Sequence, residues 1–437
     1  IQSSPFLACS ALPEFWDTSG PMIFLHAGCR RHSQKHLVKN VTSTTLASPM
    51  SNASSYPRIH EDFTRLYESL LGALTASLND IHHAYRSPKY WRVLLGPWLT
   101  SWLVVFIDRF EAIESAFSLH PDLHTIGLAK PHWTTSTDSR DFMINCADDL
   151  FNLQLYSEIL VLTSRPVILQ ERVPNEIERP SQHSTGSWAK RAIKLALASC
   201  LRASYIFDTP KHDAIVVDSY LLKRELLGLW LRSNCRVWPQ YQNSFHLPKS
   251  IRSEADSRQQ ISSRLQTTMR SINGIRLRED VLAELTSRHL PLCFVEGYKS
   301  LIAFSEELYP RIPRGIFTTH ASFYDEAFKH WAGRSCEKGT RLLLGQHGGN
   351  GRHSEFEPVI EHEHAIADTY MSWGSPENKR EGNERFVPPL NFIGLTPHES
   401  INATQGVLFG ATHVGRFFHT LIPLLSPQRF ETYLVRQ

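Results

Sequence analysis

Four short apolar segments alternate with longer helical patterns in the second half of this chain. They read AIVVDSYL (214–221), LPLCFVEG (290–297), RGIFTTHASF (314–323) and TRLLLGQHGG (340–349). Buried strands of about four to six residues that alternate with helices of about twelve residues are typical of a parallel sheet in an α/β fold. We therefore predict an α/β fold with Rossmann-type parallel sheets.

A polar residue stands near the end of each of these segments. The residues are Asp218, Glu296, His320 and His347. In open α/β sheets, ligands bind in the crevice outside the carboxyl ends of the strands. These four positions are therefore the first candidates for a functional site.

The first part of the chain is predicted to be rich in helix. Apolar runs at residues 6–12 and 22–28 predict two strands, because proline and glycine bound them. Apolar residues at helical spacing predict long helices over about 60–83, 89–118 and 148–162.

A chain of 437 residues is too long for one ordinary core, so we expect more than one domain. Residues 163–190 carry several prolines and polar residues and predict a linker or surface loop. The predicted domains are residues 1–190, an N-terminal α/β region with long helices; residues 191–400, a Rossmann-like region with the candidate site; and residues 401–437, the start of a further Rossmann-like half.

One apolar stretch, WRVLLGPWLTSWLVVFIDRF (91–110), raises the question of a membrane span. Its uncharged part covers only residues 93–107, whereas a span needs about 20 residues. Charged residues bound this part on both sides, and Gly96-Pro97 interrupts it. We predict a buried core helix here.

Charge and cysteine content exclude some classes of protein. The 46 Lys and Arg residues nearly balance the 43 Asp and Glu residues, which argues against a nucleic-acid partner recognised by electrostatics. The seven cysteines include no Cys-x-x-Cys pair, which disfavours a disulfide framework or a thiolate zinc site. A reducing compartment fits this pattern better, so we predict a cytoplasmic protein.

The glycine-rich loop GQHGGNG (345–351) follows the last segment of the series. It has neither the Gly-Lys-Ser/Thr of a Walker loop nor the Gly-x-Gly-x-x-Gly spacing of a dinucleotide fold. Two interpretations therefore stay open, a plain turn and a ligand-binding loop. The ligand-binding loop is favoured because Gly348 and Gly349 allow a ligand to approach backbone N–H groups closely. Side chains that can add hydrogen bonds are those of Gln346, His347 and Asn350.

Histidines gather in the same region. Six of the 22 histidines fall within residues 320–364, and histidine can move protons near neutral pH or bind phosphate when charged. This clustering indicates an active-site region. His330 lies in the middle of a predicted helix, and we expect it to be an ordinary surface residue.

The segment EPVIEHEHAIAD (357–368) leaves several functions open. If it is a strand, His362 and His364 share one face, and Glu361 and Glu363 share the other. A zinc site needs three or four ligands, and no third ligand is suitably spaced, so we predict no metal. The two glutamates either bind sugar hydroxyls, take part in acid–base chemistry or lie in a solvated segment.

Asp218 has two possible roles. It precedes a helical pattern, and aspartate is favoured at the N-cap position of helices. It also ends a buried strand, where a carboxylate that faces a cleft can act as a base or a nucleophile.

Several motifs of the chain occur in a recognisable order. They are FLACSALPEFWD, MIFLHAGCR, YWRVLLGPWL followed by DRF, NLQLYSEIL, GQHGGN and EHEHAIADTYMSWG. With these motifs the chain resembles, over most of residues 5–412, a family of transferases from bacterial surface-polysaccharide loci. That family is similar to the retaining Kdo transferases, which have a two-Rossmann (GT-B) architecture. It is more distantly similar to polyol-phosphate transferases that carry a His-Gly loop.

The resemblance implies a glycosyltransferase. It would move a sugar from a nucleotide-activated donor, such as CMP-Kdo, to a growing surface polysaccharide. A polyol-phosphate transferase and a non-catalytic glycan- or partner-binding relative are the alternatives. Asp218 would be the nucleophile, with His320 and His347 as further catalytic residues, and no metal or cofactor is expected. The substrate-binding candidates are Gln346, Gly348, Gly349, Asn350, Glu361 and Glu363.

The expected partners are the nucleotide-sugar donor and a glycan or lipid-linked saccharide acceptor, with the acceptor on the side of residues 1–190. Membrane association is expected to be peripheral at most. One motif departs from the family: its Leu-Gly-Glu-Trp-Cys stretch reads FLHAGCR here, so the Glu and Trp are absent. Family members also continue past the equivalent of Gln437, so we expect the C-terminal half of this chain to be truncated.

Overall fold

The computed structural model describes residues 4–49, 56–171, 213–240, 245–272, 277–347, 357–372, 382–386 and 416–417. Its strands are β1 (Phe6–Ala8), β2 (Met22–Phe24), β3 (Ser43–Thr45), β4 (Thr125–Leu128), β5 (Val167–Gln170), β6 (Ala214–Val217), β7 (Val237–Gln240), β8 (Gly315–Thr318), β9 (Arg341–Gly345), β10 (Thr369–Ser372) and β11 (Glu384–Phe386). Its α-helices are α1 (Tyr56–His82), α2 (Pro88–Leu119), α3 (Ser139–Asn145), α4 (Asp149–Leu162), α6 (Lys223–Arg232), α7 (Ala255–Met269), α8 (Glu279–His289), α9 (Tyr298–Leu308), α10 (Ala321–Tyr324), α11 (Glu326–Cys336) and α12 (Pro358–Ile366). The predicted α/β class with parallel sheets is confirmed.

The larger sheet has six parallel strands in the order β11-β10-β9-β8-β6-β7. In this sheet β6 comes first in the sequence, and β7 pairs with one of its edges. The chain then crosses to the other edge of β6, where β8, β9, β10 and β11 follow in order. The boundary between β6 and β8 is thus a topological switch point, where the loops after the two strands leave a crevice for a ligand. Asp218 directly follows β6, and His320 follows β8.

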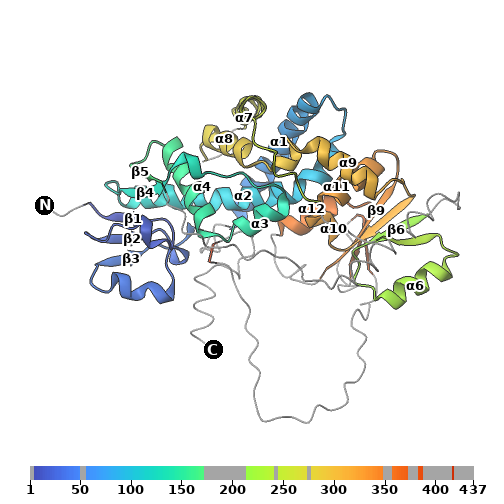
Figure 1. Ribbon diagram of the computed structural model, residues 1–437, viewed down its shortest axis with the longest axis horizontal. Helices are drawn as coiled ribbons and strands as arrows, with labels where there is room; N and C mark the ends of the chain where they lie inside the picture. Colours follow the sequence, from blue (N-terminus) through green and yellow to red (C-terminus); the bar gives the residue numbers. More distant parts are fainter. Residues whose placement is uncertain are drawn as a thin grey trace, which may run out of the picture.

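A second parallel arrangement lies in the N-terminal region. Strands β1, β2 and β3 form one sheet, and β4 pairs with β5. An isolated bridge joins Phe6 of β1 to His124, so the strands follow the order β3-β2-β1-β4-β5, which is Rossmann-like. Figure 1 shows these strands at one end of the molecule and the larger sheet at the other, with helices between them.

Helix α2, with 32 residues, runs through the centre of the molecule (Figure 1). It packs against α1, α4, α11 and α12. By length and composition it is the one helix of the described ranges that could cross a bilayer, yet its whole apolar window is buried inside the fold. Such burial is typical of the core helix of a globular domain. The prediction of a buried core helix over residues 91–110 is confirmed.

Gly96 of α2 provides the space that lets α12 pack closely. A Cβ atom at this position would lie 2.0 Å from Cε1 of His362 and 2.8 Å from the hydroxyl of Tyr67. The His362 ring is buried there, with Nδ1 3.2 Å from the Tyr67 hydroxyl. Burial lowers the pKa of His362 to about 3, so the ring is neutral at pH 7. The Gly96-Pro97 interruption in the apolar stretch is therefore the contact point of α12.

The predicted strand at residues 290–297 is wrong. Leu292–Phe294 form a 3-10 turn, and the chain then enters α9. A short, continuous apolar run is buried in either conformation, so its pattern could not distinguish a strand from a turn. Glu296 therefore does not end a strand; it forms a buried ion pair with Arg258 of α7 (2.8 Å).

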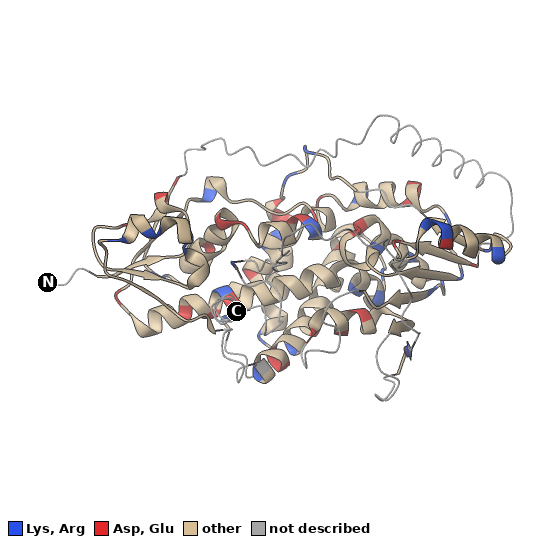
Figure 2. Ribbon diagram, turned by 90° about the horizontal axis from the view of Figure 1, so that it is seen from below, with Lys and Arg blue, Asp and Glu red and all other residues tan. Residues whose placement is uncertain are grey.

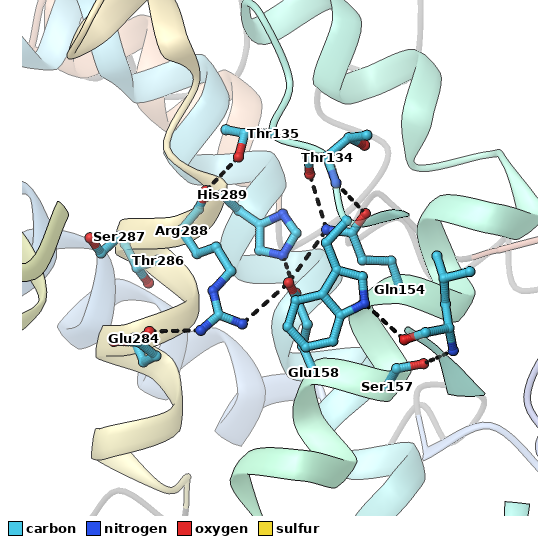
Figure 3. Close-up of polar contacts among 12 residues, drawn as sticks. Thr134, Thr135, Gln154, Ser157, Glu158, Glu284, Thr286, Ser287, Arg288 and His289 are labelled. Atoms are coloured by element: carbon cyan, nitrogen blue, oxygen red, sulfur yellow. Dashed lines mark hydrogen bonds and ion pairs between the residues drawn. The ribbon is translucent and has the colours of Figure 1, made fainter. Parts of the chain in front are cut away.

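Acidic and basic residues are mixed along the ribbon (Figure 2). A charged network with a buried centre joins α4 and α8 (Figure 3). Glu158 Oε2 lies 2.5 Å from His289 Nε2, and both side chains are almost fully buried. Arg288 lies 3.4 Å from Glu158 Oε1 and 2.7 Å from Glu284. The ring of Trp102 stacks on His289 at 4.9 Å between centroids. The network thus ties α2, α4 and α8 together.

The predicted domain boundaries at residues 190 and 400 and most of residues 401–437 lie outside the described residues. The domain division and the truncated C-terminal half therefore stay predictions. Two residues of this last part are described. Arg416 donates a hydrogen bond to the Gly28 carbonyl oxygen (2.7 Å), and Phe417 packs edge-on against His26 (5.5 Å). Both lie against the N-terminal region.

Candidate active site

Asp218 leaves the sheet at the switch point with a left-handed backbone (φ 46°). Its carbonyl oxygen accepts hydrogen bonds from the backbone N–H (3.1 Å) and the hydroxyl (2.7 Å) of Thr319, which fastens the end of β6 to the end of β8. Aspartate tolerates this conformation better than most residues, and residues held in it often belong to functional sites. Helix α6 begins only at Lys223, so Asp218 is not its N-cap, and Asp218 is exposed.

His320 is held between two hydroxyl groups. Its Nδ1 lies 3.1 Å from Thr319 Oγ1, and its Nε2 lies 2.8 Å from the Tyr220 hydroxyl. The Thr319 hydroxyl already gives its proton to the Asp218 carbonyl, so it accepts from His320. We therefore assign the proton of neutral His320 to Nδ1, with Nε2 as the acceptor for Tyr220.

His347 lies beside His320, with 5.3 Å between the ring centroids. Its Nε2 lies 2.9 Å from Oε1 of Glu363, whose carboxylate is buried. The other oxygen of Glu363 accepts a hydrogen bond from the Tyr370 hydroxyl (3.2 Å). A carboxylate with both oxygens engaged fixes the orientation of its histidine partner. Strands β8, β9 and β10 and helix α12 thus position one pair of imidazoles.

Glu361 and Glu363 do not come together. Residues 358–366 form helix α12 and not a strand, so residues two apart point in different directions. Glu361 is on the outside and pairs with His60 of α1 (2.7 Å), whereas Glu363 points to His347. His364 stacks on Tyr370, with 4.2 Å between centroids.

A cavity of about 430 Å³ opens at the ends of β6 and β8. This volume lies within the usual range for small-molecule sites, about 300–1,000 Å³. Part of its wall consists of the strand-end residues, and another part, the helix wall, comes from the amino-terminal ends of α3 and α11. The lining residues are Asp138, Arg140, Asp218, Phe245, His246, His320, Tyr324, Asp325 and Glu326.

Other predicted site residues are not tested or lie elsewhere. Gly348, Gly349 and Asn350 lie outside the described residues. Gln346 is buried, and its backbone N–H donates to the Met371 carbonyl (2.8 Å), which continues the pairing of β9 with β10. Within the described ranges, no three His, Cys, Asp or Glu side chains are grouped so that they could hold a metal ion.

His330 was expected at the surface, and this expectation is wrong. It is fully buried in α11, where its Nδ1 lies 3.0 Å from the Ser305 hydroxyl. Burial lowers the pKa of His330 to about 3. Helix α11 packs against α2 on one side and α9 on another, so it lacks the solvent-facing side that a helical histidine usually occupies.

Sequence reasoning missed several residues of the site. Tyr220 stands only two positions after Asp218, so its place in the strand-end loop was a usable signal. Asp325 precedes α11 as its N-cap and accepts a hydrogen bond from Phe328 N (3.0 Å), a local pattern that also could have been found. Asp138 and Arg140 come from a short helix far away in the sequence, and no local signal connects them to the site.

We expect His320 to titrate below the usual histidine value of 6.5. Burial is the main cause of its lowered pKa, and the nearby positive charge of His347 adds to it; the carboxylates of Asp218 and Glu363 act in the opposite direction. The change His347→Gln removes that charge and should raise the pKa of His320. Proton NMR of the imidazole Cε1–H signal against pH measures both values. An unchanged midpoint in the variant would contradict the contact between the two rings.

Comparison with known proteins gives one match. A family model described as "LIC12162 family transferase" matches residues 5–437. No curated protein and no solved structure matches the chain.

Proposed function

Because this chain belongs to the LIC12162 family of transferases, we propose that it is a glycosyltransferase. It takes a sugar from a nucleotide-activated donor, of the CMP-Kdo type, and adds it to a growing surface polysaccharide. The observation that carries the proposal is the meeting of Asp218, His320 and His347 at the switch point of a parallel sheet. This is the position where open α/β sheets bind nucleotides and other ligands.

The chemistry of these groups supports the transfer of a group from a phosphate. A carboxylate near the anomeric carbon acts as nucleophile, and positive charge near the departing phosphate stabilises the transition state. Glu363 Oε1 holds the His347 ring through Nε2 (2.9 Å), so the orientation of this ring is fixed. His347 is the one of the two histidines that faces the phosphate charge. His320 has a lowered pKa and acts as a neutral hydrogen-bonding group.

The wider features of the proposal have separate support. Two Rossmann-like strand orders are compatible with the two-Rossmann (GT-B) architecture. The six cysteines of the described part are free thiols, which supports a cytoplasmic location. Burial of the apolar part of α2 supports membrane contact that is peripheral at most.

The test is release of nucleotide from a panel of donors. The panel contains a CMP-linked acidic sugar, a UDP-linked neutral sugar and CDP-glycerol, and free nucleotide is measured by chromatography. We expect release from the CMP-linked sugar and a higher rate when a saccharide acceptor is added. Release from CDP-glycerol alone would assign the protein to polyol-phosphate transfer. No release from any donor, with binding of the saccharide, would indicate a non-catalytic glycan-binding protein.

A further inference from the structure

We propose that Asp325 is the catalytic base that accepts the proton of the acceptor hydroxyl group. This inference rests on the proposed function and assigns a role to a residue outside the predicted site. Asp325 and Asp218 line the same cavity from different elements: Asp218 follows strand β6, and Asp325 caps helix α11. The cavity thus brings together a carboxylate at the strand ends and a second carboxylate at the helix wall.

The helix wall is held firmly in place. Glu326, the next residue, is buried and pairs with buried Lys329 (2.8 Å). The same Glu326 accepts a hydrogen bond from the backbone N–H of Ser139 (3.0 Å), and Lys329 donates one to the Ser139 hydroxyl (3.2 Å). The amino-terminal ends of α3 and α11 are therefore joined, and Asp325 sits at this junction. A base must be held within hydrogen-bond reach of its proton donor, and a fixed wall meets that need.

The surroundings of Asp325 favour proton uptake. Burial raises its pKa to about 6, the N–H of Phe328 acts in the opposite direction, and the charge of Glu326 raises it further. Lys329 lowers it. A carboxylate with this pKa is ionised at pH 7 and is a stronger base than an ordinary aspartate. The other charged or titratable groups that line the cavity are Asp138, Arg140, Asp218, His246, His320 and Tyr324.

The two carboxylates, Asp218 and Asp325, lie in different surroundings, which suits two different roles. Asp218 is exposed at the end of the sheet, close to the two histidines, whereas Asp325 is half-buried next to α3. Helix α3 belongs to the N-terminal region, the side on which the acceptor was expected. Two carboxylates in unlike surroundings are the usual arrangement for a nucleophile and an acid–base group.

The proposed reaction takes place in two steps. An oxygen of Asp218 bonds to the anomeric carbon, the bond from that carbon to the donor phosphate breaks, and the nucleotide leaves with the electron pair. The acceptor oxygen then bonds to the anomeric carbon, and the ester bond to Asp218 breaks with its electron pair returning to the carboxylate. The acceptor proton passes to Oδ2 of Asp325, because Oδ1 accepts the hydrogen bond from Phe328 N.

The experiment uses the full chain and the change Asp325→Asn. Asparagine is as good an N-cap as aspartate, so α11 is retained while the base is lost. The matched control is Asp148→Asn, which also replaces a helix N-cap, at α4, outside the cavity. Should Asp325→Asn fail to fold by circular dichroism, Asp325→Ser replaces it, since serine also caps helices.

Transfer of sugar from the CMP-linked donor to the saccharide acceptor is followed from pH 5 to pH 9. We expect kcat/KM of Asp325→Asn to fall by at least about 100-fold, the usual contribution of a general base. The decrease of the wild-type rate below about pH 6 should be absent from its residual activity. Asp148→Asn should match the wild type in rate and pH profile.

Two results would overturn the proposal, and they can be told apart. If the wild type transfers sugar and Asp325→Asn stays within threefold of it with the same pH profile, the base is another group and the proposed function stands. If the wild type itself transfers from no nucleotide-linked donor, the proposed function fails and the role of Asp325 fails with it.

Discussion

The change Asp218→Asn is expected to reduce the transfer rate by at least about a thousandfold, which corresponds to about 4 kcal/mol of transition-state stabilisation. The asparagine side chain has the same shape but lacks the ionised oxygen that, in the proposed function, bonds to the anomeric carbon. It is also the best-matched replacement for the backbone, because asparagine tolerates the left-handed φ of 46° that alanine resists. The measurement is kcat for nucleotide release in the presence of acceptor.

A control for this variant lies on the same strand. Asp213 stands at the opposite end of β6, where it pairs with Arg236 (3.4 Å) and Arg314 (3.6 Å). Asp213→Asn should leave kcat unchanged. Donor affinity, measured by calorimetry, should be similar for the wild type and Asp218→Asn, because the nucleophile contributes to the reaction and little to binding. An Asp218→Asn enzyme that keeps a third or more of the wild-type kcat would exclude the nucleophile role.

The change Glu158→Ala should lower the free energy of unfolding more than any other substitution proposed above. It leaves His289 and Arg288 without their buried carboxylate (Figure 3), and breaking a buried ion pair by removing one partner costs about 3–5 kcal/mol. Urea unfolding followed by circular dichroism measures the effect as a lower midpoint. The control is Glu114→Ala at a more exposed pair with Arg165 (3.0 Å), which should cost at most about 1 kcal/mol. Equal losses in both variants would show that the buried network contributes no more than a surface pair.

The same network gives a pH dependence. Burial alone would raise the pKa of Glu158, but the attraction of His289 and Arg288 outweighs burial and lowers it below the ordinary 4.5. A folded-state pKa below the unfolded value means that this stabilisation is complete above about pH 4.5 and is lost as the pH falls through the lower folded-state value. The difference in urea midpoint between the wild type and Glu158→Gln should therefore shrink below pH 4.5.

The part of the candidate site that could be predicted from the sequence consists of residues at the carboxyl ends of parallel strands. Asp218, His320 and His347 were chosen because each ends an apolar run, and the structure brings these three together at one edge of the sheet. Parallel strands make this possible, because their carboxyl ends all meet at the same edge. The same reasoning was wrong for Glu296, because the buried turn that precedes it has the same apolar pattern as a strand.

Contacts between distant segments could not be predicted. The segment 358–366 begins with Pro-Val-Ile, which suits a strand or a helix, and only its packing on α2 and β10 makes it α12. The helix geometry then decides that Glu363 and not Glu361 meets His347. Similarly, the wall formed by Asp138 and Arg140 depends on how α3 docks against α11. Hydrophobic periodicity reports which side of an element is buried and gives no information about its neighbour.

The close packing at Gly96 has a consequence for the motion of the site. No residue that lines the cavity comes from α2, yet α2 holds the ring of His362, and Glu363 is the next residue along α12. Helix α12 can neither slide along α2 nor rotate about its own axis without expelling that ring. The position of Glu363, and with it the orientation of the His347 ring, is therefore fixed by a helix that does not line the cavity.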